Sequence, residues 1–249
     1  KGVFMIPAGA TKSPTPAPPS FSNTKSLAFD GVDEYVDCGN ISALNGVTEA
    51  TWMGWFKRDA SGSYYLISTW GVTGSTRQFS VIQTPTQLTV FMALGGFGNQ
   101  RTMFTNTTLT FTTGVWYHLA FVYNEAEVSN ADKMKVYING VLQANQSAGN
   151  AINYINPSTA SFEIGKLGGY TTNEFNGNID EVAIFTSALT SEQINTIATA
   201  PSDLSIYNPI AWYRNGDGDT FPTIADNGSG GNNGTMINME AGDIVNDVP

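Results

Sequence analysis

Hydrophobic and polar residues alternate along most of this chain in short runs, not in long stretches. From Ser26 onward, runs rich in β-branched and aromatic residues are separated every ~8–12 residues by clusters of Gly, Asn, Asp, Ser and Thr. This pattern is typical of an antiparallel β-sandwich. We expect strands at residues 26–30, 34–38, 50–57, 64–69, 77–83, 87–93, 101–105, 116–123, 133–138, 141–144, 160–165 and 178–185.

Two local signals support these strands. Asn139 and Gly140 stand between two apolar runs and predict a tight hairpin, because both central residues of a type I′ turn need positive φ. Residues 190–197 are the one stretch that predicts a helix, with Thr190 as its N-cap. Since long helices do not alternate with the strands, a parallel α/β fold is disfavoured.

The first 25 residues differ from the rest because they are rich in proline. Proline lacks a backbone donor and favours extended conformations, so we expect residues 1–25 to form an arm. Its apolar tip, Val3–Ile6, either adds to a neighbouring sheet as a strand or is frayed. Because the sequence begins with Lys1 and not with Met, we expect it to start inside a longer product.

Composition narrows the possible partners. Only 13% of the residues are charged and the net charge is −10, which disfavours nucleic acid and anionic membranes as partners. No apolar run approaches the ~20 residues that span a bilayer, and no secretion signal is recognisable. The single cysteine, Cys38, excludes an internal disulfide and is expected to be buried as a small hydrophobic residue.

Five segments, taken in order, resemble the laminin-G-like family of concanavalin A-like lectin jelly rolls. They carry the sequences SLAFDGVDEYV, TWMGWFK, WYHLAFVY, VYING and GNIDEVAIF with ALT and Ile194 after it, and they lie within residues 26–197. The resemblance implies an all-β fold of two facing antiparallel sheets in a jelly-roll sandwich, with one short helix. We assign this sandwich to residues 26–200.

The C-terminal segment, residues 201–249, contains AWYRNGDGDT and DNGSGGNNGTM. Both are similar to the part of the family that ordinarily precedes the first strand. The segment therefore either completes the sandwich in permuted order or begins a second repeat. We favour completion of the sandwich, because a lone strand pair cannot bury its own apolar face.

Carboxylates near turns suggest a cation site. The resemblance implies that Asp30, Gly31 and Asp180 meet near one structural Ca²⁺, and Asp33 and Asp37 lie close by in sequence. The alternative is that Asp30 and Asp180 cap turns. A second candidate is the loop from Asn215 through Asp217 and Asp219 to Asp226, which departs from a calcium loop and is expected to be an Asp/Gly turn.

Catalysis finds little support in the sequence. Glycoside cleavage needs a carboxylate pair at controlled separation, and no strand carries such a pair. Asp180 and Glu181 are adjacent, so we expect their side chains to point to opposite faces of a strand. The sole histidine, His118, lies in the WYH strand and is expected to be packed.

Carbohydrate binding would use aromatic residues near loops, because flat rings cover the apolar faces of sugars. We single out Trp70, Tyr170 and Phe175 as ligand-binding candidates. The wider set also includes Tyr64, Tyr65, Phe97 and Tyr154. The alternative for the whole set is burial in the core or in contacts between subunits.

These observations favour a non-catalytic structural, decoration or fibre module on a virion surface, similar to laminin-G-like proteins of marine phages. Such a module would dock through its arm onto other virion or surface proteins, form a homo-oligomer, and present a binding surface. The alternative is a secreted or cell-surface bacterial lectin or adhesin that binds a glycan. A third class, a glycoside hydrolase, would require an acid pair in a cleft.

Overall fold

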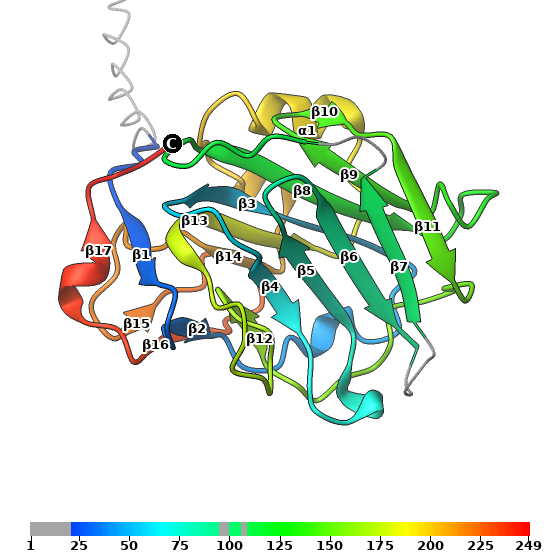
Figure 1. The fold of residues 1–249 in the computed structure, drawn as a ribbon, viewed down its shortest axis with the longest axis horizontal. Helices are drawn as coiled ribbons and strands as arrows, with labels where there is room; N and C mark the ends of the chain where they lie inside the picture. Colours follow the sequence, from blue (N-terminus) through cyan, green and yellow to red (C-terminus); the bar gives the residue numbers. More distant parts are fainter. Residues whose placement is uncertain (1–20, 95–99, 106–108) are drawn as a thin grey trace, which may run out of the picture.

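Two antiparallel β-sheets lie face to face in the computed structural model, which describes residues 21–94, 100–105 and 109–249 (Figure 1). The predicted all-β jelly-roll sandwich is confirmed. Each of the twelve expected strands has a counterpart within a few residues. Phe97 and Val3–Ile6 fall outside the described residues.

The first sheet, sheet A, has eight strands in the described part of the chain, in the order β10-β9-β8-β3-β13-β1-β17, with β14 also paired to β13. Its strands are β1 (Ser26–Asp30), β3 (Glu49–Arg58), β8 (Tyr117–Asn124), β9 (Met134–Ile138), β10 (Val141–Leu142), β13 (Asn176–Phe185), β14 (Ala211–Tyr213) and β17 (Ile244–Val245). The expected hairpin joins β9 to β10, where Asn139 and Gly140 have φ of 48° and 78°.

The second sheet, sheet B, has nine strands among the described residues, in the order β11-β7-β6-β5-β4-β12-β2-β16-β15. They are β2 (Tyr35–Asp37), β4 (Tyr64–Thr69), β5 (Phe79–Gln83), β6 (Leu88–Ala93), β7 (Gln100–Thr105), β11 (Asn145–Gly149), β12 (Phe162–Ile164), β15 (Thr223–Ile224) and β16 (Gly234–Ile237). The edge strand β11 was not expected, because its sequence NQSAG has no apolar alternation.

Residues after 200 contribute strands to both sheets. β14 pairs with β13 and β17 pairs with β1 in sheet A, while β16 pairs with β2 in sheet B. In this way the tail lies next to the first strands of the chain. Figure 1 shows the C-terminus beside the start of the described chain, where Lys25 Nζ donates to Asn246 Oδ1.

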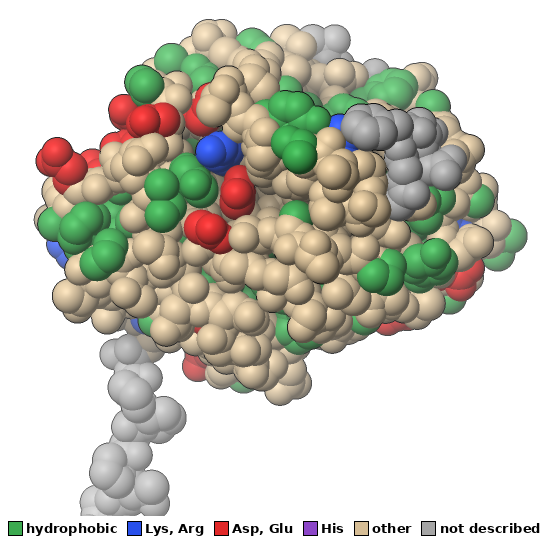
Figure 2. Space-filling model, turned by 90° about the horizontal axis from the view of Figure 1, so that it is seen from below, with side chains coloured by type: hydrophobic (Ala, Val, Ile, Leu, Met, Phe, Trp, Pro, Cys, Tyr) green, Lys and Arg blue, Asp and Glu red, His purple; other side chains and the backbone are tan. Residues whose placement is uncertain are grey.

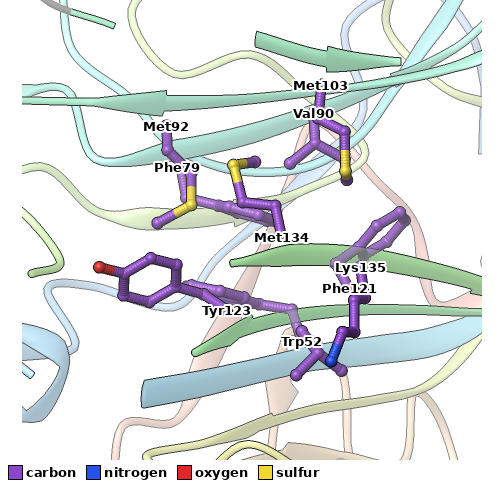
Figure 3. A pocket seen from close by; sticks show the side chains of 10 residues that line it. Trp52, Phe79, Val90, Met92, Met103, Phe121, Tyr123, Met134 and Lys135 are labelled. Carbon is purple, nitrogen blue, oxygen red and sulfur yellow. The ribbon is translucent and has the colours of Figure 1, made fainter. Parts of the chain in front are cut away.

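The main core fills the space between the two sheets. Trp52 of sheet A stacks on Phe79 of sheet B with ring centroids 4.0 Å apart and planes within 4°. Figure 3 shows Trp52 and Tyr123 on one side, Met92 and Met103 on the other, and Met134 reaching between them. The gap left there has a volume of about 10 Å³, room for about one water molecule, so it is no ligand site.

The helix α1 (Ser191–Ile197) covers the outer face of sheet A. Thr190 caps it, with its Oγ1 accepting from Gln193 N and the Gln193 side chain accepting from Thr190 N. Ile194 and Ile197 pack on outward residues of sheet A such as Met53 and Ala120. Short 3₁₀ turns lie at Ser42–Leu44, Gly74–Thr76, Ser205–Tyr207 and Ala241–Asp243.

On the face shown in Figure 2, acidic and basic side chains gather in a few places and most of the area is neither charged nor hydrophobic. Among the described residues, no helix has the length and hydrophobicity that crossing a membrane requires.

Candidate functional site

The outer face of sheet B carries a row of paired residues that runs across the strands. Ser68 of β4 pairs with Ser80 of β5, Ser80 with Phe91 of β6, and Phe91 with Thr102 of β7. Their sequence neighbours, such as Val81 and Val90, face the core between the sheets. Since side chains alternate along a strand, the row points away from the core.

Ser80 leaves a depression in this face, because its side chain is much smaller than the rings around it. The depression has a volume of about 140 Å³ and is lined by Tyr65, Trp70, Ser80, Phe91, Gln100 and Leu167. We call it the outer hollow. Trp70 and Leu167 form a small apolar cluster with Ala93, against which Tyr65, Phe91 and Tyr170 pack.

The hydroxyl of Ser80 is a buried polar group in the outer hollow. Ser80 is 1% exposed, and among the described residues its Oγ has no hydrogen-bond partner. Ser68, its register neighbour, differs: its Oγ donates to Lys166 O at 2.9 Å and accepts from Gly168 N at 3.0 Å. A buried hydroxyl without a partner is destabilising, so Ser80 is positioned to bond a ligand group.

The loop of residues 165–170 closes one side of the outer hollow. It is held to β4 through the two hydrogen bonds of Ser68, and Gly168 lies so close to the backbone that a Cβ there would be 2.0 Å from Trp70 O. Only glycine permits this approach. The fixed loop places Leu167 in the wall of the outer hollow.

Arg77 joins two of the aromatic residues. Its guanidinium lies 5.2 Å from the ring centroid of Trp70, and its Nη2 donates a 2.8 Å hydrogen bond to Tyr170 Oη. Its Nε also donates to Gly71 O at 3.3 Å. Arg77 therefore fixes the positions of Trp70 and Tyr170 relative to each other.

Two acids lie beside and beneath the loop on the same face. Glu163 of β12 pairs with Asp37 of β2. Burial raises the pKa of Glu163 to about 7, while Lys166 opposes the rise and Asp37 adds to it. Glu163 Oε2 is shielded from solvent without a partner and would be 3.4 Å from a Cβ on Gly168. This oxygen therefore lies under the loop, outside the lining of the outer hollow.

The three ligand-binding candidates from the sequence have different outcomes. Trp70 and Tyr170 are brought together by Arg77, and Trp70 lines the outer hollow. Phe175 is not part of this surface, because it is 0% exposed and packs edge-on against Phe29 and Phe56. The placement of Phe175 in a binding surface is therefore wrong.

The wider aromatic set divides in the same way. Tyr65 lines the outer hollow. Tyr64 faces the core and contacts Phe175 with ring centroids 5.9 Å apart. Tyr154 is 44% exposed but is not among the residues that line the outer hollow.

The residues expected to share a calcium ion are not brought together. Asp30 pairs with Asn176, four residues before Asp180 on β13, which separates them by roughly 13 Å. Asp30 Oδ1 accepts from Val32 N, and Gly31 takes the positive φ of 77° that this turn requires. These three residues therefore do not fit one shared ion, and calcium binding stays a prediction without support from these positions.

Most of the remaining acids of the expected cation sites accept hydrogen bonds from backbone groups, and Asp217 accepts from Thr24 N and Thr24 Oγ1. Asp37 Oδ1 accepts from Gly39 N, and Asp33 lies exposed in the turn after Asp30. In the second candidate loop, Asp219 accepts from Gly216 N and Ala225 N, and Asp226 accepts from Trp212 N, Gly228 N and Asn232 N. Within the described ranges, no three His, Cys, Asp or Glu side chains form a metal-binding group.

Asp180 and Glu181 require a correction. The pairing of β13 with β3 shifts register between Asp180 and Ala183, and Glu181 has a φ of 49°. This β-bulge lets Glu181 bond Trp212, which packs on the outer face of sheet A, the same face to which Asp180 belongs. The expectation of opposite faces is therefore wrong.

The two acids are buried and held by neighbours. Asp180 accepts from Asn23 Nδ2, and Glu181 accepts from Trp212 Nε1 at 2.6 Å and Arg214 Nε at 3.3 Å. Burial raises the pKa of Asp180 to about 8 and that of Glu181 to about 7. They form part of the packing under the tail, on the face opposite to the outer hollow.

His118 is packed, as expected, with its ring 5.2 Å from that of Trp55. Burial lowers the pKa of His118 to about 3, so its ring is neutral near pH 7. Cys38 is buried, also as expected.

Sequence reasoning missed Ser80, Phe91, Leu167 and Arg77. The sequence does indicate that Ser80 and Phe91 face outward, because each stands between core-facing residues in an alternating strand. Nothing in the sequence shows that Ser80 lacks a partner while Ser68 has two.

Comparisons with known proteins agree with this architecture. Residues 30–195 match the model of Laminin_G_3, described as the concanavalin A-like lectin/glucanases superfamily. No curated protein matches the sequence.

Several solved structures are similar in fold. A candidate carbohydrate-binding protein from Bacteroides ovatus has a TM-score of 0.63 and 20% identity, over 87% of this chain and 58% of that one. The CBM40 of the Ruminococcus gnavus IT-sialidase, bound to α2,6 sialyllactose, has a TM-score of 0.57 and 13% identity, over 70% and 96%. A heptameric SAP-like pentraxin from Limulus polyphemus has a TM-score of 0.55 and 17% identity, over 73% and 84%.

Proposed function

Because this chain belongs to the Laminin_G_3 family of the concanavalin A-like lectin/glucanases superfamily, we propose that it is a non-catalytic carbohydrate-binding module. The ligand occupies the outer hollow on sheet B. One observation carries the proposal: the buried, unpartnered hydroxyl of Ser80 lies at the base of a depression whose walls are aromatic.

A sugar matches both the aromatic and the polar parts of the outer hollow. Its C–H faces cover aromatic rings, here Tyr65, Trp70 and Phe91. Its hydroxyl groups can satisfy the oxygen of Ser80 and the amide of Gln100, which together fix the orientation of the ring. A purely apolar ligand would leave Ser80 unpaired, which is unfavourable.

The similar structures support a ligand of this class. The CBM40 of Ruminococcus gnavus is bound to sialyllactose, and the Bacteroides ovatus protein is a candidate carbohydrate binder. Their identities of 13% and 20% to this chain establish a shared fold, so the sugar itself is not transferred.

The acids of the molecule favour binding without cleavage. Glu163 and Asp37 are neighbours across two strands, and a pair of carboxyl groups is what glycoside hydrolysis requires. However, Glu163 Oε2 lies under the loop of residues 165–170, and neither acid lines the outer hollow. A sugar in the outer hollow would therefore not reach this pair.

Binding to a mixed array of neutral and acidic glycans, followed by titration calorimetry with the strongest hit, tests the proposal. We expect Trp70→Ala, once thermal unfolding has verified that it is folded because Trp70 is only 7% exposed, to lose at least about tenfold in affinity, because a wall of the outer hollow is removed. The matched control is Trp116→Ala, since Trp116 contacts Lys57 and Asp247 far from this face. Equal affinities of both variants and the wild type, or release of sugar by the purified protein, would contradict it.

The setting of the module is a further part of the proposal. We place it on a virion surface as a structural or decoration protein, with a secreted or cell-surface bacterial adhesin as the alternative. Support comes from the anchoring of the arm: Phe21 stacks on Trp212, Asn23 bonds Asp180, and Thr24 bonds Asp217. This anchor lies on sheet A, so an arm that docks to a neighbouring protein would leave the outer hollow facing outward.

Immunogold labelling of particles purified from the native source tests the setting. Labelled particles would support the virion role. Label confined to cells or to the soluble fraction would favour the adhesin.

A further inference from the structure

As far as the described residues 21–94, 100–105 and 109–249 show, the outer hollow is closed on one side and open on the other. Toward β12 it meets the loop of residues 165–170, which is fastened to Ser68, a residue with no exposed surface. In the opposite direction the row continues through Phe91 and Thr102 to Ala148 of the edge strand β11.

Side-chain burial decreases steadily along this row from β5 to β11. Ser80 is buried, Phe91 and Thr102 are half-buried, and Ala148 is exposed. Strands in a sheet lie ~4.8 Å apart, so the path from Ser80 to Ala148 is roughly 14 Å long. That length suits a short oligosaccharide and not a single sugar.

An aromatic ring also lies on the open side of the outer hollow. Phe104 is two residues beyond Thr102 on β7, so it points to the same outer face, and it is half-buried. Thr89 of β6 pairs with it and adds a hydroxyl. These residues repeat, farther out, the combination of ring and hydroxyl found in the outer hollow.

From this asymmetry, and resting on the proposed carbohydrate function, we propose that the protein binds the end of an oligosaccharide chain. The terminal sugar fills the outer hollow, and the rest of the chain runs across β6 and β7 over Phe104 toward β11. An internal segment of a polysaccharide does not fit, because the loop of residues 165–170 blocks its continuation toward β12.

Two variants on the same face separate this proposal from binding by a featureless aromatic surface. Phe104 lies on the open side of the outer hollow. Tyr35 of β2 lies on the blocked side, beyond the loop, where Lys166 Nζ is 4.0 Å from its ring centroid. The full chain with Phe104→Ala or Tyr35→Ala is compared with the wild type, and thermal unfolding verifies that each variant is folded.

The probes are taken from an array of free oligosaccharides: the strongest tetrasaccharide, its terminal monosaccharide, and the same tetrasaccharide extended by one sugar at the bound end. We expect Phe104→Ala to weaken tetrasaccharide binding roughly threefold to tenfold and to leave monosaccharide binding unchanged. Tyr35→Ala should change neither affinity. The extended probe should lose binding.

The outcomes distinguish the two proposals. Undiminished binding of the extended probe, or equal losses in the two variants, overturns the inference of chain-end recognition but leaves carbohydrate binding intact. No binding of the wild type to any glycan overturns the proposed function and this inference with it.

Discussion

Arg77 and Tyr170 are joined by a 2.8 Å hydrogen bond from Nη2 to Oη, although the two residues belong to separate loops of the chain. The same guanidinium lies over the ring of Trp70. This contact couples the turn after β4 to the loop after β12, and both border the outer hollow. The shape of the site therefore depends on a polar contact at its rim as well as on its aromatic walls.

Removing this contact should weaken ligand binding without disturbing the fold. Tyr170→Phe deletes the acceptor of Arg77 Nη2 and keeps the ring. We expect a loss of roughly threefold to tenfold in glycan affinity, since one hydrogen bond to a charged donor is lost at a partly exposed position. Calorimetry would measure this, with Tyr35→Phe as the control. A similar loss in both tyrosine variants would argue against a specific role for the Arg77 contact.

Ser80 and Ser68 should respond in opposite ways to the same substitution. Ser80→Ala removes a buried hydroxyl that has no partner, so we expect unchanged or slightly higher stability and about tenfold weaker glycan binding. Ser68→Ala leaves Lys166 O and Gly168 N without their partner. It should lower the free energy of unfolding by about 1–3 kcal/mol.

Urea unfolding and calorimetry on the two serine variants provide the measurement. Equal destabilisation of both variants would mean that the Ser80 hydroxyl has an internal partner. That result would remove the main support for a ligand at this position.

Phe175 is expected to matter for stability alone. Phe175→Leu shortens a side chain that packs against Phe29, Phe56 and Tyr64. We expect it to destabilise the protein by about 1–3 kcal/mol, with glycan affinity unchanged. If a calorimetric titration showed weaker glycan binding by the folded variant, Phe175 would have to contribute to the binding site.

Asp180 should make stability fall as the pH rises from about 4 to 8, while the lowered pKa of His118 acts in the opposite direction between about 3 and 6.5. Burial raises the pKa of Asp180 from 3.8 to about 8, so the folded state holds a proton that the unfolded state has lost. The stabilising effect is complete below pH ~4 and is lost as the pH rises through 8. Asp180→Asn cannot ionise, so its stability relative to the wild type should increase between pH 5 and pH 9.

Urea unfolding of both proteins at several pH values measures this difference. Glu181, with its pKa raised to about 7, contributes in the same direction and remains in the variant. Parallel stability curves for wild type and variant would show that Asp180 is ionised in the folded protein.

The sequence predicted most strands because both sheets have one face in the core, so their apolar residues alternate. It missed β11, whose residues NQSAG border solvent and carry no such pattern. The short strands β14 to β17 of the tail depend on pairing with distant segments, which local pattern does not report. The bulge that turns Glu181 to the face of Asp180 is likewise a property of the pairing.

The site was predictable only in part, for a similar reason. Trp70 and Tyr170 stood out as aromatic residues near loops, but Phe175 carried the same signal and points into the core. The family resemblance predicts that Asp30 and Asp180 converge, but the register pairs Asp30 with Asn176 instead. The hydroxyl of Ser68 has hydrogen-bond partners and that of Ser80 has none among the described residues. This difference follows from three-dimensional contacts and cannot be predicted from the sequence.

The central claim is that a carbohydrate binds in the outer hollow, and the tryptophan side chains test it most directly. The chain has five tryptophans, of which Trp70 lines this depression. In an NMR titration with the strongest glycan, the indole N–H signal of Trp70 should shift progressively while those of Trp52, Trp55, Trp116 and Trp212 stay in place. A shift of Trp55 or Trp116 with an unmoved Trp70 signal would contradict the account.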